Sequence, residues 1–586
     1  MSSKVQLARL FDEMADLLEL QEANPFRVRA YQRASQALEG LDGEVEDRIE
    51  EDTLLEIPGI GKDLAEKIGE FVESGSVAEH RELKEQVPRV LLEMTRIPGV
   101  GPKNAVRLHR ELQVESLDHL EAACRSGAVA GLEGFGPKSQ ENILEGIDFV
   151  RRVSERRPLG LALPVAEEFV ALLRGATGVE EVSVAGSLRR MRETIGDVDI
   201  LAASADPGPV MEVFTAAPGV ARVLARGETR SSIRTDDDLQ VDLRVVEPKT
   251  WGAALLYFTG SKEHNIRLRE MAMKEDLKVS EYGIFDLSGV DPAERKDPGS
   301  GERVHSETEE GCYESLGLPW IPPELREDTG EIQAAREGRL PELITPADIR
   351  GDLHAHTDAS DGKQTLEELV EAARTMGYAY IAVTDHSRSL KIAGGLGLDR
   401  MERQIERVRE LDAAFDDIDV LAGSEVDILK DGSLDYPDGL LERLDVVIAS
   451  VHTHFGMSEE EQTRRVCRAM ENPFAFALGH PTGRLLGERD PYDIDMDRVL
   501  EKAAETGTAL EINANPRRLD LTDRRARQAA DMRIPILIST DAHRRGQLDF
   551  MDLGVKVARR AWLEADMVVN TLPPDAMREE IRRKRP

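Results

Sequence analysis

The sequence is poor in cysteine, in aromatic residues and in long apolar runs, and each shortage excludes a class of protein. Its 586 residues include three cysteines, Cys124, Cys312 and Cys467, which lie far apart and share no metal-ligand spacing. Neither a disulfide framework nor a thiolate metal site is therefore expected. No apolar run reaches the roughly 18 residues of a membrane span, and no basic leader with an apolar stretch opens the chain. We expect a cytoplasmic protein with no membrane contact.

Basic residues are also scarce, with 76 Lys and Arg against 112 Asp and Glu and a formal net charge of -36. This balance argues against general attraction to nucleic acid, which depends on counterion release by basic side chains. Two interpretations remain open: an ordinary acidic protein with a local basic groove, or an acidic surface suited to a salt-rich cytoplasm. A steep loss of DNA affinity with rising salt would favour the first, and a shallow one the second.

A hairpin signal occurs three times in the first 150 residues, which otherwise show the pattern of short amphipathic helices. The copies occupy residues 57–61, 97–101 and 132–136, and a helical pattern follows each one. Paired glycines before a helix can bring backbone N–H groups close to a phosphate. One copy alone would be an ordinary helix cap and turn, but three predict helix-hairpin-helix units that hold DNA without reading its sequence. The glycines expected to face DNA are Gly59, Gly61, Gly99, Gly101, Gly134 and Gly136.

A glycine-serine turn carries the first strong chemical signal. Residues 182–185 have the pattern of a strand that ends where Gly186 and Ser187 begin, with Arg190 shortly after. The N–H groups of this turn, the Ser187 hydroxyl and Arg190 can bind a triphosphate.

Three aspartates follow this turn. Asp197 and Asp199, after Gly196, are two residues apart at the start of a predicted strand, so both side chains lie on one face. Asp242, within a predicted strand over 239–246, would add a third carboxylate. Together they could hold two Mg²⁺ or Mn²⁺ ions about 3.5–4 Å apart, the arrangement that catalyses nucleotidyl transfer.

These motifs resemble the signature of family X DNA polymerases, the group of DNA polymerase beta, and the resemblance covers nearly all of residues 1–318. It implies deoxynucleoside triphosphates and gapped or primed duplex DNA as substrates. The family's thumb motif is matched by the sequence Tyr-Phe-Thr-Gly-Ser at 257–261, which includes Gly260. On this match Tyr257 and Phe258 would line the sugar and exclude ribonucleotides, and Asn265 and Arg269 would lie near the nascent base pair and the template.

Two positions leave details open under the same resemblance. Gln240 stands where animal members have an arginine beside the third aspartate. Lys67 matches the Schiff-base lysine that removes 5′-deoxyribose phosphate, a reaction that needs an amine able to lose its proton. Phe26 and Arg27 replace a more basic pocket of animal relatives, so an active lyase and a solvated helix lysine both remain open.

The C-terminal part concentrates histidine. Seven of the twelve histidines lie between residues 354 and 543, almost all directly after apolar runs with the pattern of strands. Seven such strands alternate with helical patterns, which predicts a barrel of β/α units with its ligands at the carboxyl ends of the strands. The predicted strands cover residues 349–356, 380–386, 420–427, 446–454, 474–480, 509–513 and 536–543.

The order of these residues resembles the PHP domain, which is named for polymerases and histidinol phosphatase. The resemblance implies a trinuclear metal site whose ligands are His354, His356, Asp361, His386, Glu425, His452, His480, Asp541 and His543. Asp385 and His454 would support these ligands from outside. Imidazole and carboxylate ligands suit Mn²⁺, Zn²⁺ or Fe, and such ions promote hydrolysis of phosphate esters.

The sequence therefore predicts a multidomain fold: a helical helix-hairpin-helix region, an α+β nucleotidyltransferase palm with a thumb, and a distorted (β/α)7 barrel. The expected segments are a lyase-like domain (1–82), a fingers-like domain (83–155), the palm (156–250), the thumb (251–318), a linker (319–345) and the PHP barrel (346–575).

The favoured function is gap-filling DNA synthesis in repair, by a monomer whose PHP domain trims 3′ ends as an exonuclease or cuts at abasic sites. One alternative is a DNA-binding scaffold with an inactive polymerase and a phosphoesterase for small molecules, which the three intact aspartates disfavour. The other is a nucleotidyltransferase that does not act on DNA, which would not need three helix-hairpin-helix units.

Overall fold

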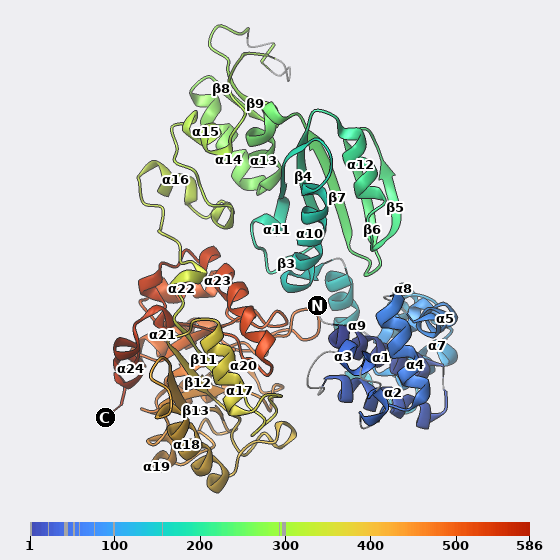
Figure 1. Cartoon of the computed structure of the whole chain (residues 1–586), viewed down its shortest axis with the longest axis vertical. Coiled ribbons are helices and arrows are strands. Elements are labelled where there is room, and N and C mark those ends of the chain that lie inside the picture. Colours follow the sequence, from blue (N-terminus) through green and yellow to red (C-terminus); the bar gives the residue numbers. More distant parts are fainter. Residues whose placement is uncertain are drawn as a thin grey trace. The chain divides into compact units, whose positions relative to one another are not determined.

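A computed structural model of the chain describes residues 3–585 except 22, 40–44, 51–52, 58, 75–76, 96, 98–99, 155, 292–293 and 296–299. The chain divides into two compact units, residues 1–155 and 156–586 (Figure 1). Helices and strands of the described residues keep the labels of Figure 1. None of the described helices is long and apolar enough to span a membrane.

The first unit is built of helices around one apolar core. Leu7, Phe11 and Leu18 of the first helix and Tyr31 of the second are buried in this core. A single helix that is apolar on one face must bury that face against others, and here the described helices do so against one another. Its elements are α1 (Ser3–Leu20), α2 (Pro25–Glu39), α3 (Val45–Glu50), η1 (Leu54–Glu56), α4 (Lys62–Ser74), α5 (Ala78–Gln86), α6 (Arg89–Thr95), α7 (Pro102–Leu112), α8 (Leu117–Arg125) and α9 (Pro137–Ser154).

The predicted palm is a mixed five-stranded sheet in the order β2-β4-β7-β6-β5, on which helices α10 and α12 pack (Figure 1). The parallel pair β4 and β7 lies inside this sheet, flanked by antiparallel neighbours. The elements are β1 (Arg157–Pro158), α10 (Leu159–Arg174), β2 (Val179–Val184), α11 (Gly186–Arg189), β3 (Thr194–Ile195), β4 (Val198–Ser204), α12 (Pro207–Thr215), β5 (Val220–Arg226), β6 (Arg230–Thr235), β7 (Gln240–Val246) and η2 (Pro248–Thr250).

The thumb core extends further along the chain than the sequence predicted. Ile321, Leu325, Ala335 and Leu343 pack in the same apolar cluster as Leu256 and Leu268, so residues 319–345 form part of a folded core instead of an extended linker. This region contains α13 (Trp251–Thr259), α14 (Lys262–Lys274), β8 (Leu277–Ser280), β9 (Gly283–Asp286), β10 (Glu302–His305), α15 (Glu309–Glu314), η3 (Pro323–Leu325) and α16 (Glu331–Arg336).

The C-terminal region is a barrel of seven parallel strands in sequential order, β11 to β17. The last strand returns to the first: Ala355 and Ala542 form a parallel bridge, and the amide of His356 donates to the carbonyl of Ala542 at 2.8 Å. The strands are β11 (Gly351–Ala355), β12 (Tyr380–Val383), β13 (Asp419–Asp427), β14 (Val446–Ser450), β15 (Ala477–Leu478), β16 (Ala509–Asn513) and β17 (Ile536–Ser539).

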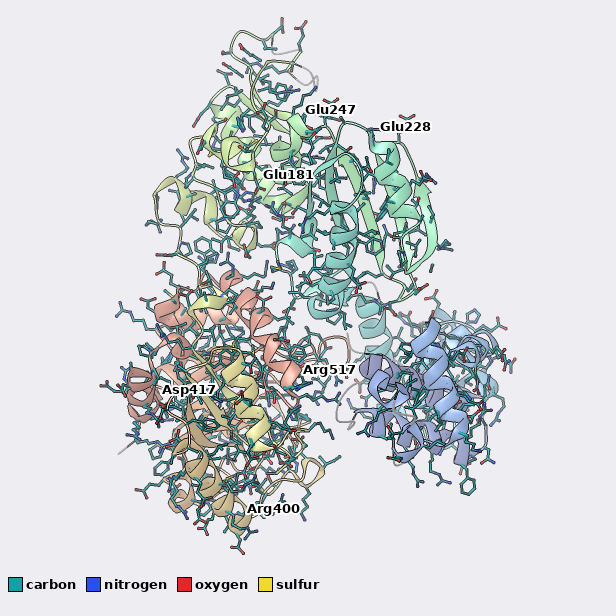
Figure 2. All side chains as sticks on the ribbon, in the orientation of Figure 1. Glu181, Glu228, Glu247, Arg400, Asp417 and Arg517 are labelled. Atoms are coloured by element: carbon teal, nitrogen blue, oxygen red, sulfur yellow. The ribbon has the colours of Figure 1, made fainter. Side chains whose placement is uncertain are left out.

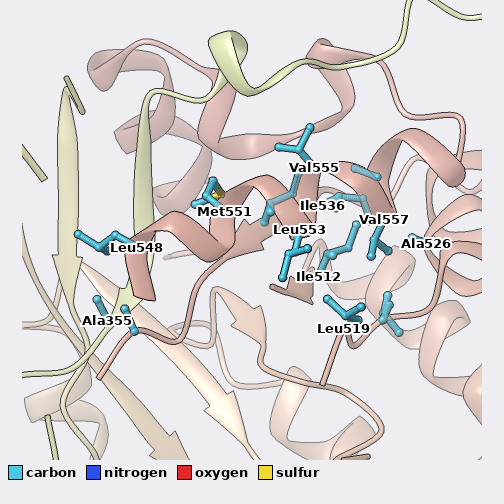
Figure 3. Close-up of a cluster of buried hydrophobic side chains, with 14 of the residues drawn as sticks. Ala355, Ile512, Leu519, Ala526, Ile536, Leu548, Met551, Leu553, Val555 and Val557 are labelled. Atoms are coloured by element: carbon cyan, nitrogen blue, oxygen red, sulfur yellow. The ribbon is translucent and has the colours of Figure 1, made fainter. Parts of the chain in front are cut away.

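Helices cover the outside of the barrel. Figure 3 shows Leu553 and Val557 of α23 against the barrel residues Ile512 and Ile536, all four of them buried. The strands are apolar on both faces because one face meets the helices and the other fills the barrel. The remaining elements are η4 (Pro346–Asp348), α17 (Leu366–Thr375), η5 (Lys391–Ala393), α18 (Leu398–Asp412), α19 (Asp438–Leu441), α20 (Glu459–Met470), α21 (Met496–Thr506), α22 (Asp523–Asp531), η6 (Arg545–Phe550), α23 (Met551–Arg560), η7 (Ala565–Met567), η8 (Val569–Thr571) and α24 (Pro574–Arg582).

Candidate active sites

The three predicted aspartates of the palm come together at the amino-terminal ends of the two central strands β4 and β7. Asp199 on β4 is the register partner of Asp242 on β7, and Asp197 immediately precedes β4. Ligand oxygens of all three lie within 4.8 Å of one another. Because parallel strands place equivalent residues side by side, the pairing of β4 with β7 is what assembles this cluster.

The electrostatics of the cluster suit a cation. Burial, together with the charges of Asp197 and Asp242, raises the pKa of Asp199 to about 7. A divalent cation would favour the ionised form and offset this repulsion. The residues therefore fit the Mg²⁺ or Mn²⁺ that the sequence predicted.

Gly186 is required where the predicted triphosphate turn meets this cluster. It has φ +57°, and a Cβ there would lie 2.1 Å from a carboxylate oxygen of Asp199. Only glycine allows both the left-handed backbone and the close approach of the turn to the carboxylate. Ser187 follows in α11, and Gly196 lies between β3 and β4.

Arg230 is a residue of this site that sequence reasoning missed. Its guanidinium lies 3.2 Å from Asp242 Oδ2, and the Gln240 amide donates to Asp242 Oδ1 at 3.2 Å. Arg230 on β6 thus places a positive charge beside the third aspartate, where Gln240 has none. No local pattern points to Arg230, because it is the β6–β7 pairing, with Ser232 opposite Asp242, that brings this strand to the site.

Arg190 joins the glycine-serine turn to the thumb motif. It donates to the carbonyl of Thr259 at 2.6 Å and lies 3.0 Å from Glu327. At Gly260, which has φ +68°, a Cβ would lie 3.2 Å from the Arg190 guanidinium. Arg560 of the barrel helix α23 also contacts this place: it donates to the carbonyl of Arg190 at 2.6 Å and to Glu327 at 3.0 Å.

The predicted nucleotide and template residues lie on α13 and α14. The ring centroids of Tyr257 and Phe258 lie 5.2 Å apart in an edge-to-face arrangement, and Arg244 lies over the Phe258 ring. Asn265 is nearly buried and donates to the carbonyl of Tyr257 at 2.7 Å, and Arg269 donates to the carbonyl of Asn265 at 3.2 Å.

The helix-hairpin-helix glycines stand before helices in the first unit. Gly61, Gly101 and Gly136 directly precede α4, α7 and α9, and a Cβ at each would meet no atom within 4 Å. This open space leaves the backbone accessible to a phosphate. Gly59 and Gly134 have φ +95° and +82°, which explains glycine there. Gly99 lies outside the described residues.

Lys67 is not a solvated helix lysine. It is 9% exposed, and its amine lies 2.6 Å from Asp63 and 3.0 Å from Glu79. Glu79 also accepts from the hydroxyl of Tyr31 at 3.0 Å and pairs with Arg27. The amine is therefore held within a polar group of side chains.

Eight of the nine predicted barrel ligands gather into three groups. The first contains His356, Asp361, His386 and His543; the second His354, His356, Glu425 and Asp541; the third His386, Glu425 and His452. Each pair of groups shares one residue, His356, His386 or Glu425, so the three groups form one continuous cluster that could hold adjacent cations. His480 stands outside these groups, with its Nε2 2.8 Å from a Glu425 oxygen.

The donor set fits metal ions. Among the described residues, His354 Nε2 and both ring nitrogens of His356 are buried and make no hydrogen bond of good geometry. Carboxylate oxygens nevertheless lie close, with Asp541 Oδ1 at 3.2 Å from His356 Nε2 and Glu425 Oε2 at 3.5 Å from His354 Nε2. Burial, together with the neighbouring His543 and His386, lowers the pKa of His356 to about 3, which keeps this imidazole neutral. Burial opposes protonation of His386, but Glu425 and Asp361 raise its pKa to about 10. A cation would therefore displace a proton from His386 on binding.

Carboxylates that the sequence analysis did not single out orient the ligands. Glu511 lies 2.6 Å from His354 Nδ1, and Asp427 lies 2.7 Å from His452 Nδ1. A histidine that donates its second ring N–H to a carboxylate is fixed in orientation for a metal. An acidic residue inside an apolar run, as in Leu510-Glu511-Ile512, was the signal that could have identified Glu511.

The two residues predicted to support the metal ligands, Asp385 and His454, differ in burial and in hydrogen bonding. Asp385 is fully buried and accepts hydrogen bonds from Thr357, Ser360 and Gln404. It thereby holds the loop that carries Asp361. His454 is instead an exposed residue with φ +60°, and no hydrogen bond of its ring is found within the described part of the chain.

Family models match four parts of the chain. They are described as a helix-hairpin-helix domain (residues 2–77), a SAM-like helix-hairpin-helix tandem (91–148), a DNA polymerase beta thumb (254–327) and a PHP domain (352–515). These matches agree with the helical region, the thumb and the barrel that the sequence predicted.

The similar proteins include DNA polymerases, which match long stretches of the chain, and probable phosphatases, which match its C-terminal part. The DNA polymerase/3′-5′ exonuclease PolX of Bacillus subtilis (strain 168) is 38% identical over 569 residues, 97% of each chain. DNA polymerase lambda of Rattus norvegicus is 25% identical over 327 residues, 52% of this chain and 53% of that protein. A "probable phosphatase" of Thermoanaerobacter sp. (strain X514) is 30% identical over 234 residues, 38% of this chain and 89% of that protein.

Proposed function

The chain belongs to the family of the DNA polymerase/3′-5′ exonuclease PolX, and on that premise we propose that it fills short gaps in DNA and trims 3′ ends with its barrel. The observation that carries this proposal is the presence of two separate acidic or histidine-rich clusters, one in the palm and one in the barrel. A scaffold with an inactive polymerase would not need the intact triad of Asp197, Asp199 and Asp242.

For synthesis, the aspartate triad faces the turn that would hold the nucleotide. Gly186, Ser187 and Arg190 bind the triphosphate, while Tyr257 and Phe258 line its sugar. Two divalent ions held by the triad would activate the primer hydroxyl and neutralise the leaving pyrophosphate. The open glycine N–H groups before α4, α7 and α9 grip the DNA backbone without reading bases, as a gap-filling enzyme requires.

For hydrolysis, the proposed site is the barrel cluster of eight of the nine predicted ligands, with His480 beside it in contact with Glu425. Metal ions held there would supply a hydroxide nucleophile and clamp the phosphate. Glu511 and Asp427 fix the imidazoles of His354 and His452. The substrate we propose is the 3′-terminal phosphodiester of DNA; cleavage at abasic sites is a second reaction open to the same site.

Separate variants test the two halves. Asp197→Ala should abolish extension of a primer across a gapped duplex and leave degradation of the 3′ strand nearly unchanged. His354→Ala combined with His356→Ala should remove degradation and the bound metal, measured by elemental analysis, and spare extension. Near wild-type extension by the first variant, or an unchanged nuclease rate in the second, would contradict the assignment of that half.

A further lyase activity on 5′-deoxyribose phosphate would use Lys67, whose amine lies 2.6 Å from Asp63 and 3.0 Å from Glu79, two carboxylates that can accept the proton the amine must lose. The amine would attack the C1′ aldehyde, lose water and form a Schiff base, so borohydride should trap the wild-type protein on incised abasic DNA. Lys67→Arg should abolish this cross-link, whereas Lys62→Arg, an exposed position of the same helix, should retain it. An equal cross-link in the Lys67→Arg variant would refute the assignment.

A further inference from the structure

One loop of the barrel presents a single apolar side chain to solvent. Residues 387–397 form most of the connection between β12 and α18, and Ile392, in the turn η5, is 96% exposed. No other large apolar side chain of the described residues is exposed as much. Single exposed apolar residues are common and need no explanation by themselves. A function for Ile392 therefore depends on where its loop lies and on how firmly the loop is held.

This loop starts and ends at the metal ligands. Ser387 directly follows His386, and its amide donates to the carbonyl of Glu425 at 3.0 Å. At the other end, the amide of Leu396 donates to the carbonyl of His386 at 2.8 Å. The loop therefore projects from the ligand-bearing end of the barrel, where a substrate must enter.

Hydrogen bonds hold the first half of the loop. The amide of Ser389 and the guanidinium of Arg388 both donate to the Asp435 carboxylate, at 2.7 and 3.1 Å. The Ser389 hydroxyl donates to Asp427, the same carboxylate that orients His452.

The second half is held against the loop that carries Asp361. Arg400, labelled in Figure 2, donates to the carbonyl of Gly394 at 3.1 Å and to that of Ala359. Gly394 has φ +68°, and a Cβ there would lie 3.0 Å from the carbonyl oxygen of Ser360. Ile392 thus stands on a fixed base between anchored segments, with buried Ala393 beside it.

We propose that Ile392 is a wedge that packs against the base pair next to the cut when a paired 3′ end enters the barrel site; this rests on the proposed exonuclease function. A terminal nucleotide within a duplex must leave its stack before its phosphodiester can reach a recessed site. Proteins that separate base steps insert apolar side chains such as isoleucine. A wedge on a hydrogen-bonded loop loses little conformational freedom on contact.

The exposed Lys391 next to Ile392 supports the same occupant, because a cation beside an apolar tip can contact the DNA backbone while the tip meets the base. The wedge is needed only where the 3′ end is paired. A single strand, whose last base is already free, does not need it.

The test compares degradation of three substrates with the same terminal nucleotide: a single strand, a fully paired end and an end with a terminal mismatch. Ile392→Ser should slow the paired end by about tenfold, the effect of a barrier change that one apolar contact can supply, and leave the other two rates and primer extension unchanged. Ile392→Leu should restore degradation of the paired end. Met376→Ser, a 40% exposed apolar residue at the opposite end of the barrel, is the matched control and should have no effect.

An unchanged ratio of paired to single-strand rates in Ile392→Ser would overturn the wedge, as would an equal loss on all three substrates with normal metal content. Failure of the proposed exonuclease itself looks different, because the wild-type protein would then degrade none of the three.

Discussion

Asp199 lies in the cluster of three carboxylates in the palm and is the one whose pKa is clearly raised. It is partly buried beside two other carboxylates, and its pKa is raised to about 7. The unfolded chain would release this proton near pH 3.9, so the folded state binds it more tightly. Without a cation, stability at this residue is therefore lost as the pH rises from about 4 through 7.

Asp199→Asn should accordingly raise the unfolding temperature of the metal-free protein at pH 8. Removal of one charge relieves repulsion on the order of a few kcal/mol at most, because each pKa unit corresponds to about 1.4 kcal/mol. Thermal unfolding in chelator at pH 8 and pH 4 measures the effect, which should vanish at the lower pH. An exposed change, Asp237→Asn, serves as the control; a destabilised Asp199→Asn at pH 8 would contradict the argument.

Repulsion among the three aspartates lowers the stability of the metal-free fold, although the same carboxylates are needed to bind the cations proposed for synthesis. Sites that must bind cations keep carboxylates close together, and the fold loses stability until the ion arrives. Added Mg²⁺ should for this reason stabilise the wild-type protein more than the Asp199→Asn variant.

At the scale of elements, one buried carboxylate ties together three segments. Glu309 at the start of α15 accepts from Arg189 of α11 at 2.7 and 2.9 Å, and from Arg326 at 2.7 Å. Trp320 Nε1 donates to it at 2.8 Å. The palm turn, the thumb helix and the segment 319–345 thus share one polar centre.

Glu309→Gln should destabilise this region by about 3–5 kcal/mol, because it leaves buried arginines without a full counter-charge. Burial opposes ionisation, but Arg326 and Arg189 hold the pKa of Glu309 below its usual range. Its contribution is therefore present above the unfolded value near pH 4.3 and is lost as the pH falls below it. Urea unfolding followed by tryptophan fluorescence should show that Glu309→Gln lowers the free energy of unfolding at pH 7. This loss should become smaller as the pH is lowered.

The neighbouring Glu310→Gln is the matched control, because Glu310 is exposed on the same helix turn. A Glu309→Gln loss no larger than that of Glu310→Gln would show that the polar centre contributes little.

At the scale of the whole second unit, the barrel helix α23 contacts the nucleotide turn of the palm. Arg560, with a 5% exposed side chain, pairs with Asp523 at 2.6 Å and Glu327 at 3.0 Å and holds the carbonyl of Arg190. The barrel thus helps to position Arg190, a residue predicted to bind the triphosphate.

Arg560→Ala should raise the KM for deoxynucleotide in primer extension by about tenfold, equal to a loss of about 1.4 kcal/mol in binding. Exonuclease rate and metal content should stay near the wild-type values. The control is Arg559→Ala, which removes contacts to Glu324 and the Ile344 carbonyl but none to Arg190. An equal KM in both variants would mean that the barrel does not position Arg190.

Much of this molecule could be read from the sequence, because its chemistry lies in short local patterns. The three glycine hairpins, the glycine-serine turn with its aspartates, and the seven strands that lead to histidines each follow from period and position along the chain. The comparisons and the barrel of β11 to β17 confirm the fold class and the enzyme type that these patterns predicted.

Only the tertiary structure decided which distant side chains support each site. Arg230 reaches Asp242 through strand pairing, Glu511 reaches His354 across the barrel, and Arg560 reaches Arg190 over 370 residues. The segment 319–345, rich in proline and charge, looked like a linker, but Arg326 is buried in an ion pair with Glu309 and Glu331 is buried against His264. Local patterns specify elements and ligand types, whereas pairing across the chain depends on packing, which no single stretch of sequence contains.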